Sequence, residues 1–338
     1  MAGVWNLGAW LVTALRYGAE AILIVWAALA IYYLPTHSAR WRMSLVAAFA
    51  IFSVWALWFE RGAIALMLFG AAYVVVLLFW LAVRPSHDRP WRPEFDRMPR
   101  ALIDGDRVRI VGVRNFQYRS TTDFTVNYEE RVVSLAHLTG VDFYVSYWMS
   151  GPVGHTFLSF VFDDAPPLTI SIEARQEIGE GYAPVGSLFK QFELIYVVGD
   201  ERDVVRVRTN FRREKVYLYH LNIPPGSARR LFLVYLERLN ALAERPEFYH
   251  LLSNSCTVNI VRYARAIGHR GSFNIRHYLN GLFDSYLYTA GRLDTSLPFE
   301  QLRALSCINS VACATDDDAD FSARIRAALP RIPVHGTR

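Results

Sequence analysis

The pattern of hydrophobic positions changes sharply near residue 83 of the chain. Before that point, apolar stretches run almost without interruption, whereas after it apolar and polar residues alternate or repeat at helical spacing. A helix that crosses a bilayer needs about 20 mainly apolar residues. The stretches Gly18–Leu34, Met43–Phe59 and Gly62–Val83 meet or approach this length. We therefore predict an anchor of about three transmembrane helices over residues 1–83.

The few charged residues of this region refine the prediction. Only Glu60 and Arg61 separate the last two stretches, which predicts a tight helical hairpin. Arg16 and Glu20 are four residues apart, so they can pair on one face of the first helix. The first stretch has no basic start and no small-residue cleavage site, which argues against a signal peptide.

The remainder of the chain has the pattern of a folded α+β domain. Residues 84–100 are rich in Pro and Arg, which is typical of an extended linker. Apolar residues at helical spacing predict helices over residues 227–245 and 255–267. Alternating or β-branched stretches predict strands over 107–113, 123–133, 141–148, 155–162, 168–173, 192–198 and 216–221. We therefore predict an α+β domain over residues 101–338.

Charge and cysteine content exclude some classes of function. The 36 basic and 31 acidic residues nearly balance, so the chain has no nucleic-acid-binding footprint. Three cysteines are too few for a disulfide framework, and the sequence leaves open whether Cys307 pairs with Cys313. Because no metal-ligand spacing and no nucleotide-binding motif is present, we expect neither a metal nor a cofactor.

Cys256 is the cysteine whose surroundings favour chemistry. It follows Ser253, Asn254 and Ser255, all good N-cap residues, and so falls in the first turn of a predicted helix. Unpaired backbone N–H groups and the helix dipole favour a thiolate there. Lowering a thiol pKa from about 8.5 to about 6 raises its ionised fraction at pH 7 from about 3% to about 90%. The alternative is an inert cysteine on the buried face of a helix.

A thiolate nucleophile normally needs a histidine, and His155 is the best candidate. It follows a Gly/Pro turn and opens an apolar strand, where a site can form at the strand edge. The alternative is a structural histidine that caps the strand. His250, six residues before Cys256, and His220 are rival candidates.

A third group could come from the next predicted strand, where Ser171, Glu173 and Arg175 alternate and so share one face. Glu173 could hold an imidazole in the tautomer and orientation that catalysis needs. The alternative is that Glu173 forms an ion pair with Arg175 or with another arginine.

Four segments of the chain resemble one known family, namely GHTFLSFVFDD, LTISIEARQEIGEGY, FELIYVVGDERDVVRVRTNFR and FYHLLSNSCTVNIVRYAR. The ordered motifs are His-Thr opening a strand, IEARxE on the next strand and Asn-x-Cys-Thr at a helix start. They resemble the Lnb N-terminal periplasmic domain family over about residues 90–330. The resemblance implies a circularly permuted papain-like, NlpC-type fold in which His155 precedes the nucleophile Cys256.

The named members of that family are lipoprotein N-acyltransferases. The resemblance thus implies a membrane-anchored thiol acyltransferase that acts on lipid or lipoprotein acyl groups through Cys256 and His155. Glu173, which the strand spacing suggests, is the candidate for the third group. Membrane lipids and lipoproteins are the expected partners, and the oligomeric state is left open. Two alternatives also stay open: an amidase or peptidase of the cell envelope with the same fold, and a non-catalytic membrane protein.

Two lines of reasoning disagree on the orientation of the domain. With three spans, Arg40, Arg42 and the arginines after residue 83 lie on one side, which the positive-inside rule assigns to the cytoplasm. The resemblance implies a periplasmic domain anchored in a bacterial inner membrane. We adopt the second expectation, because the rule weighs short loops most and the short loop here contributes two arginines.

Overall fold

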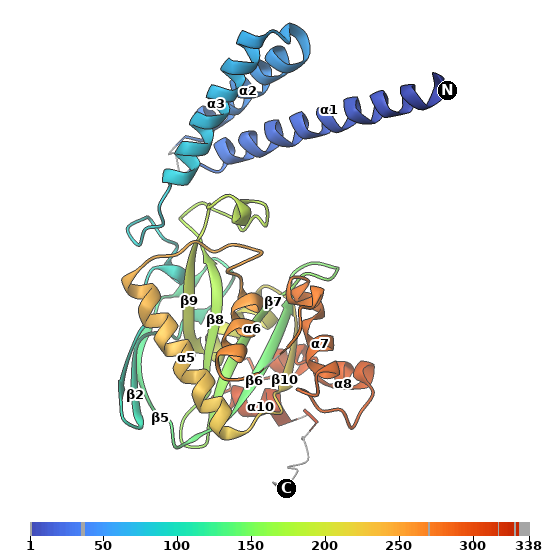
Figure 1. Ribbon diagram of the computed structural model, residues 1–338. Coiled ribbons are helices and arrows are strands. Elements are labelled where there is room, and N and C mark those ends of the chain that lie inside the picture. Colours follow the sequence, from blue (N-terminus) through green and yellow to red (C-terminus); the bar gives the residue numbers. More distant parts are fainter. Residues whose placement is uncertain (1, 35–37, 270, 317, 328, 331–338) are drawn as a thin grey trace. The chain divides into compact units, whose positions relative to one another are not determined.

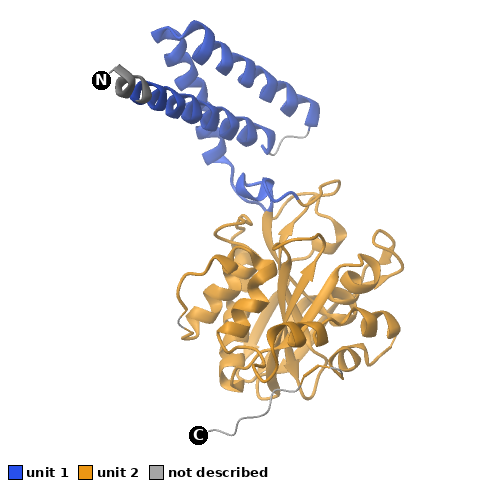
Figure 2. Ribbon diagram, turned by 90° about the vertical axis from the view of Figure 1, so that its right-hand side faces the viewer, with its two compact units in different colours: residues 1–86, 183–192 blue, residues 87–182, 193–338 orange. Residues whose placement is uncertain are grey.

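The computed structural model describes residues 2–34, 38–269, 271–316, 318–327 and 329–330, and the chain forms two compact units (Figure 1, Figure 2). The first unit comprises Met1–Ser86 and Ala183–Phe192, and the second comprises His87–Tyr182 and Glu193–Arg338. Helices and a mixed β-sheet occur together, which confirms the predicted α+β class.

Apolar helices make up most of the first unit. They are α1 (Ala2–Tyr32), α2 (Ala39–Val54), which continues into the π-helical turn η1 (Trp55–Glu60), and α3 (Ala63–Ala82). Stretches of 25, 22 and 20 residues in these helices are long and apolar enough to cross a membrane. The predicted tight hairpin is confirmed, because the chain reverses at Arg61, which adopts a left-handed conformation with φ of 55°.

A polar contact joins α1 to the hairpin. Arg16 Nε lies 2.7 Å from Glu20 Oε1, which confirms the predicted pair on the helix face. Trp58 Nε1 donates a hydrogen bond to the other oxygen, Glu20 Oε2, at 2.9 Å. An acidic side chain in an apolar span is costly unless it is paired, and here both carboxylate oxygens have donors.

The segment 183–192 packs within the first unit although it lies between two strands of the sheet in sequence. The Phe189 ring stacks on Tyr33 with a centroid separation of 5.9 Å. Lys190 Nζ donates hydrogen bonds to the carbonyl oxygens of Trp80 at 2.9 Å and Val83 at 3.3 Å. The lysine thereby satisfies carbonyls that the last turn of α3 leaves without intrahelical donors.

An eight-stranded sheet forms the centre of the second unit. Its strands are β1 (Arg100–Asp104), β2 (Arg107–Arg114), β5 (Tyr128–Ser134), β6 (Leu138–Tyr147), β7 (His155–Phe162), β8 (Leu168–Arg175), β9 (Glu193–Asp200) and β10 (Lys215–His220). The strand order is β1-β2-β9-β8-β7-β6-β10, and β5 also pairs with β2. Described neighbours are antiparallel except β2 and β9, which are parallel. The short strands β3 (Gln117–Tyr118) and β4 (Phe124–Thr125) form a separate pair.

Helices cover both faces of the central strands (Figure 1). The helical segments of this unit are η2 (Pro93–Phe95), α4 (Glu201–Val204), η4 (Val207–Phe211), α5 (Pro225–Glu244), α6 (Cys256–Ala266), η5 (Ile275–His277), η6 (Asn280–Leu282), α7 (Phe283–Thr289), α8 (Phe299–Leu305), α9 (Asn309–Ala314) and α10 (Phe321–Ala327). Phe160 of β7 packs on Phe232 of α5 on one face. Phe157 of β7 belongs to the core on the other face, with Ile308 and Phe321. Side chains of β7 therefore alternate between two cores, as the pleat of a strand requires.

The segment 84–100, which the sequence predicts as a linker, divides between the two units. From His87 onward it packs into the second unit. Trp91 is buried, and the guanidinium of Arg175 lies 4.1 Å from the centre of its ring. Phe95 is buried in the core that contains Phe157.

Candidate active site

Cys256 is the first residue of α6, at the helix start that the sequence predicts. The N-cap, Ser255, has extended backbone angles (φ −104°, ψ 174°), so the chain enters the helix abruptly and the thiol sits at the end of the helix dipole. Cys256 is 1% exposed. Asn280 Nδ2 donates to Cys256 Sγ at 3.7 Å, which favours the thiolate form.

His155 is the first residue of β7, and the loop before it is held against the same asparagine. Gly154 N donates a hydrogen bond to Asn280 Oδ1 at 2.9 Å. A Cβ atom at Gly154 would approach Ser146 O to 2.9 Å, so a glycine is needed for this close approach. Asn280 therefore contacts both the loop that carries His155 and the sulfur of Cys256.

A serine and a carboxylate on β8 orient the imidazole. His155 Nε2 lies 2.7 Å from Ser171 Oγ, which in turn donates to Glu173 Oε1 at 2.9 Å. Glu173 Oε1 is also 3.5 Å from His155 Nε2. Because Nε2 is directed at β8, Nδ1 is the ring nitrogen left to face Cys256. Glu173 thus acts on the imidazole by its charge and through the hydroxyl of Ser171.

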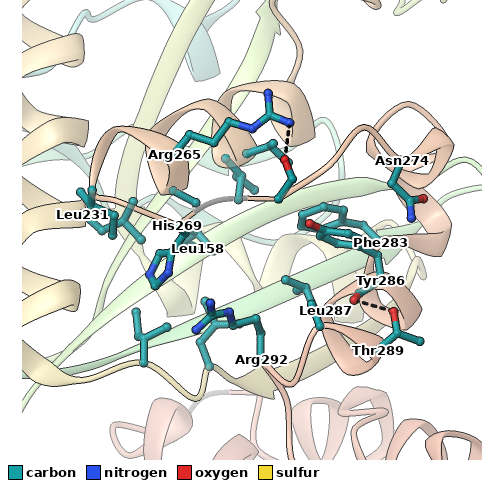
Figure 3. A pocket seen from close by; sticks show the side chains of 18 of the residues that line it. Leu158, Leu231, Arg265, His269, Asn274, Phe283, Tyr286, Leu287, Thr289 and Arg292 are labelled. Atoms are coloured by element: carbon teal, nitrogen blue, oxygen red, sulfur yellow. Dashed lines mark hydrogen bonds between the residues drawn. The ribbon is translucent and has the colours of Figure 1, made fainter.

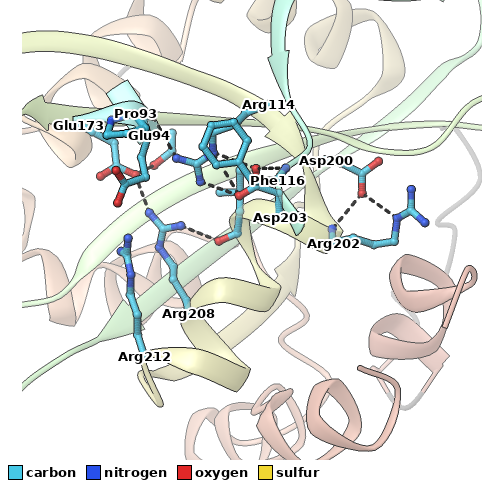
Figure 4. Close-up of polar contacts among 12 residues, drawn as sticks. Pro93, Glu94, Arg114, Phe116, Glu173, Asp200, Arg202, Asp203, Arg208 and Arg212 are labelled. Atoms are coloured by element: carbon cyan, nitrogen blue, oxygen red, sulfur yellow. Dashed lines mark hydrogen bonds and ion pairs between the residues drawn. The ribbon is translucent and has the colours of Figure 1, made fainter. Parts of the chain in front are cut away.

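Glu173 is held by a buried arginine that the sequence did not single out (Figure 4). Arg208 of η4 is 3% exposed at its side chain, and its Nη2 lies 2.5 Å from Glu173 Oε1. Arg175, the partner considered from the sequence, is instead bonded to the carbonyl oxygens of Phe95 at 2.8 Å and Asp96 at 2.7 Å. The carboxylate therefore shares its charge between the imidazole of His155 and the guanidinium of Arg208.

The electrostatics of this cluster favour an ion pair between cysteine and histidine. Burial alone would raise the pKa of the Cys256 thiol, but hydrogen bonding to His155, the charge of His155 and donors of Thr156 lower it from 9.0 to about 6. Burial alone would lower the pKa of His155, but the charge of Glu173 and hydrogen bonds to Cys256 and Glu173 raise it to about 9. Both shifts favour a thiolate beside an imidazolium near neutral pH.

Two groups near the sulfur can stabilise an oxyanion. The backbone N–H of Cys256 is in the first turn of α6, where no intrahelical acceptor exists for it. This backbone N–H also acts against the rise in the pKa of Tyr249, so the phenol lies near the same helix start. Burial raises the pKa of Tyr249 well above 10, so its phenol stays protonated and can itself donate. A carbonyl oxygen placed at this point would meet hydrogen-bond donors while the thiolate attacks its carbon.

The rival histidines lie in other environments. His250 Nδ1 is 3.0 Å from Ser253 Oγ, and His220 Nδ1 is 2.8 Å from Asp142 Oδ1. Among the described residues, no hydrogen bond joins either histidine to Cys256. The remaining cysteines, Cys307 and Cys313, are free thiols, as is Cys256, so the disulfide left open by the sequence is not formed.

One group of side chains has the spacing of metal ligands. His137, Asp163 and Asp164 place one ligand atom each within 4.8 Å of one another, and all three side chains are exposed. Asp163 directly follows β7 and so lies at the opposite end of that strand from His155. An ion pair between His137 Nδ1 and Asp163 Oδ1 at 2.6 Å accounts for this arrangement.

Comparison with known proteins identifies the family. A family model, the Lnb N-terminal periplasmic domain, matches residues 124–290, a range that includes His155, Glu173 and Cys256. No curated protein and no solved structure gives a match. The family and the three apolar helices together make this a membrane-anchored protein with a periplasmic domain, so the orientation suggested by the positive-inside rule is wrong. Through residues 124–290, the chain belongs to the family of the Lnb N-terminal periplasmic domain.

Proposed function

We propose that the protein is a membrane-anchored thiol acyltransferase that moves an acyl group from a membrane lipid to an amine, with Cys256 as the nucleophile. The observation that carries the proposal is the cluster of Cys256, His155, Ser171 and Glu173, whose electrostatics favour a thiolate and an imidazolium at neutral pH. Nucleophile, base and orienting group in this order are the arrangement that nucleophilic catalysis needs.

The proposed reaction has two halves. The Cys256 thiolate attacks the carbonyl carbon of an acyl ester, and the resulting oxyanion is stabilised at the start of α6. The C–O bond breaks, His155 gives its proton to the departing alkoxide, and the acyl group stays on sulfur as a thioester. An amine then attacks the thioester, His155 takes the proton of the amine, and the thiolate leaves as the amide forms.

Burial of the nucleophile supports transfer to an amine over transfer to water. Cys256 is 1% exposed, so water has little access to a thioester formed there. The apolar helices keep the domain at a bilayer, which raises the effective concentration of lipid donors and of a lipid-linked acceptor. Membrane lipids as donors, and the free amino group of a lipoprotein's N-terminal cysteine as acceptor, fit both features.

The test uses the full chain in mixed micelles with a diacyl phospholipid and a synthetic lipopeptide that carries a free α-amine. We expect the lipopeptide to gain the mass of one acyl chain. Cys256→Ser and His155→Ala should abolish this gain, and Cys307→Ser should keep it.

Two results would contradict the proposal. Full activity of Cys256→Ser would remove the nucleophile from the account. Release of free fatty acid with no acylated amine would identify a hydrolase instead of a transferase.

A further inference from the structure

A cavity of about 470 Å³ lies between β7, α6 and α7 in the second unit (Figure 3). This volume is in the range of pockets that bind small molecules. Much of its wall is apolar and is formed by Leu158, Leu231, Ile260, Phe283 and Leu287, among other residues. The mechanism proposed above leaves this cavity without a role.

The walls of the cavity continue the segments that surround the nucleophile. Ile260 lies one turn beyond Cys256 on α6, which is a rise of about 6 Å. Leu158 lies three residues beyond His155 on β7, on the opposite face of the strand, and Phe283 directly follows η6, whose first residue donates to the sulfur. A ligand in this cavity would therefore lie along α6 beyond Cys256, on the face of β7 opposite to the His155 side chain.

The charged part of the wall is cationic. Arg265 and Arg292 line the cavity, and none of its described lining residues is an Asp or a Glu. His269 also lines it, but burial and the nearby arginines lower its pKa below 6.5, so its ring is neutral. Arg265 Nη2 has a carbonyl partner, Gly271 O, at 3.2 Å. The Nε2 atom of His269 is buried and has no hydrogen-bond partner among the described residues. An apolar hollow with uncompensated positive charge fits a ligand that has a hydrocarbon chain and an anionic group.

We propose that this cavity binds an acyl chain of an anionic phospholipid, with the phosphate at Arg265 and Arg292 and the chain among the apolar residues. The inference rests on the proposed function, because it names the class of lipid that supplies the acyl group. Exposed apolar residues of the polypeptide beside the cavity support contact with lipid. Phe273 and Ile275 are 72% and 58% exposed, and they flank lining residues of the cavity.

Chain length offers one measurable consequence. Each methylene group that enters an apolar pocket improves the affinity about fourfold. Affinity for an anionic lysophospholipid should therefore rise steeply with chain length and stop rising once the cavity is full. Partitioning into a bilayer alone has no such limit.

The experiment uses the full chain with Cys256→Ala, so that no acyl transfer takes place, in nanodiscs of phosphatidylcholine. The probe is lysophosphatidylglycerol with a diazirine in its acyl chain, and the adducts are located by peptide mass spectrometry. Ala264→Trp fills the cavity, and Ala241→Trp is the matched control on an exposed position of α5. Arg292→Gln removes a cation from the cavity, and Arg245→Gln removes an exposed one elsewhere.

We expect adducts in the peptides that carry α6 and α7, reduced at least tenfold by Ala264→Trp and about fivefold by Arg292→Gln, with both controls unchanged. Adducts confined to the helices of the first unit would overturn the proposal, as would labelling of a folded Ala264→Trp variant at the original level. Equal labelling by an uncharged acyl probe or by a fatty acid probe would overturn the assignment of the phosphate.

This outcome is independent of catalysis, because the labelled protein lacks the nucleophile. Intact cavity labelling in a protein whose wild-type form acylates no amine would refute the transferase and keep the lipid site. Acylation of the amine by the wild-type form without labelling of the cavity would keep the transferase and refute the lipid site.

Discussion

Removal of the His155 imidazole should shift the ionisation of Cys256 by at least three pH units. With His155 present, the pKa of the thiol is about 6, and hydrogen bonding and charge from His155 are the main causes of its lowering. His155→Ala removes both, and the burial that remains raises the pKa to the ordinary value of 9.0 or above. At pH 6 the thiolate fraction should then fall from about one half to about 0.1%, which is about 500-fold.

The rate of alkylation changes less than the thiolate fraction, because a more basic thiolate is a better nucleophile. With a Brønsted coefficient of about 0.4–0.5, a thiolate whose pKa is three units higher reacts about 20 times faster. The net loss for His155→Ala is therefore about 25-fold at pH 6 and only about fivefold at pH 7. Alkylation at pH 6 therefore distinguishes the wild-type protein from His155→Ala better than alkylation at pH 7.

The assay is alkylation of the full chain by a small reagent such as iodoacetamide, followed as a function of pH between 4.5 and 10. Cys307→Ser and Cys313→Ser make Cys256 the remaining thiol. His250→Ala is the matched control, because His250 is close in sequence and bonds to Ser253. A midpoint near 6 that moves above 9 in His155→Ala alone supports the ion pair. A wild-type midpoint near 9, or a shift in the His250 variant, would refute the reasoning.

Three further predictions concern the groups behind the imidazole. Arg208→Gln should lower the free energy of unfolding by about 3–5 kcal/mol in denaturant titrations, because it leaves the Glu173 charge without its buried partner. Arg202→Gln should change it little, because the Arg202 side chain is 42% exposed. Ser171→Ala should slow acyl transfer about tenfold and leave the melting temperature nearly unchanged, because it removes one hydrogen bond to the imidazole. Burial alone would raise the pKa of Glu173, but Arg208 and then His155 hold it well below 4.5, so its contribution to stability is present above pH 4.5 and is lost as the pH falls further. The stability of Glu173→Gln should therefore fall less steeply than that of the wild type as the pH drops below 4.5. An equal fall in both proteins would contradict the assignment.

Features that depend on local patterns could be predicted from the sequence. β7 has the predicted bounds, and α6 begins one residue after the predicted helix start. In both cases a turn or capping residues adjoin an apolar segment of regular period. The edge strand β1 was not predicted, because four of its five residues are exposed and it has no buried face to set an alternating pattern.

Partners that are far apart in sequence could not be predicted. The face shared by Glu173 and Arg175 suggested a local ion pair, but the Arg175 guanidinium reaches backbone carbonyls near η2. Arg208 lies in a π-helical turn beyond β9, and Asn280 lies in a short 3₁₀ turn. Neither turn is long enough to show a hydrophobic period from which its position could be predicted. Each lies at the site because of the order in which the strands pair in the sheet.

The central claim, that Cys256 carries an acyl group during turnover, is tested most directly by trapping the acyl-enzyme. The full chain is mixed with a diacyl phospholipid in the absence of an amine, quenched in acid and analysed by peptide mass spectrometry. The account predicts one acyl chain on the peptide that contains Cys256, removed by neutral hydroxylamine and missing from His155→Ala. Turnover of the lipid with no adduct on Cys256, or with the adduct on Cys307 or Cys313, would contradict it.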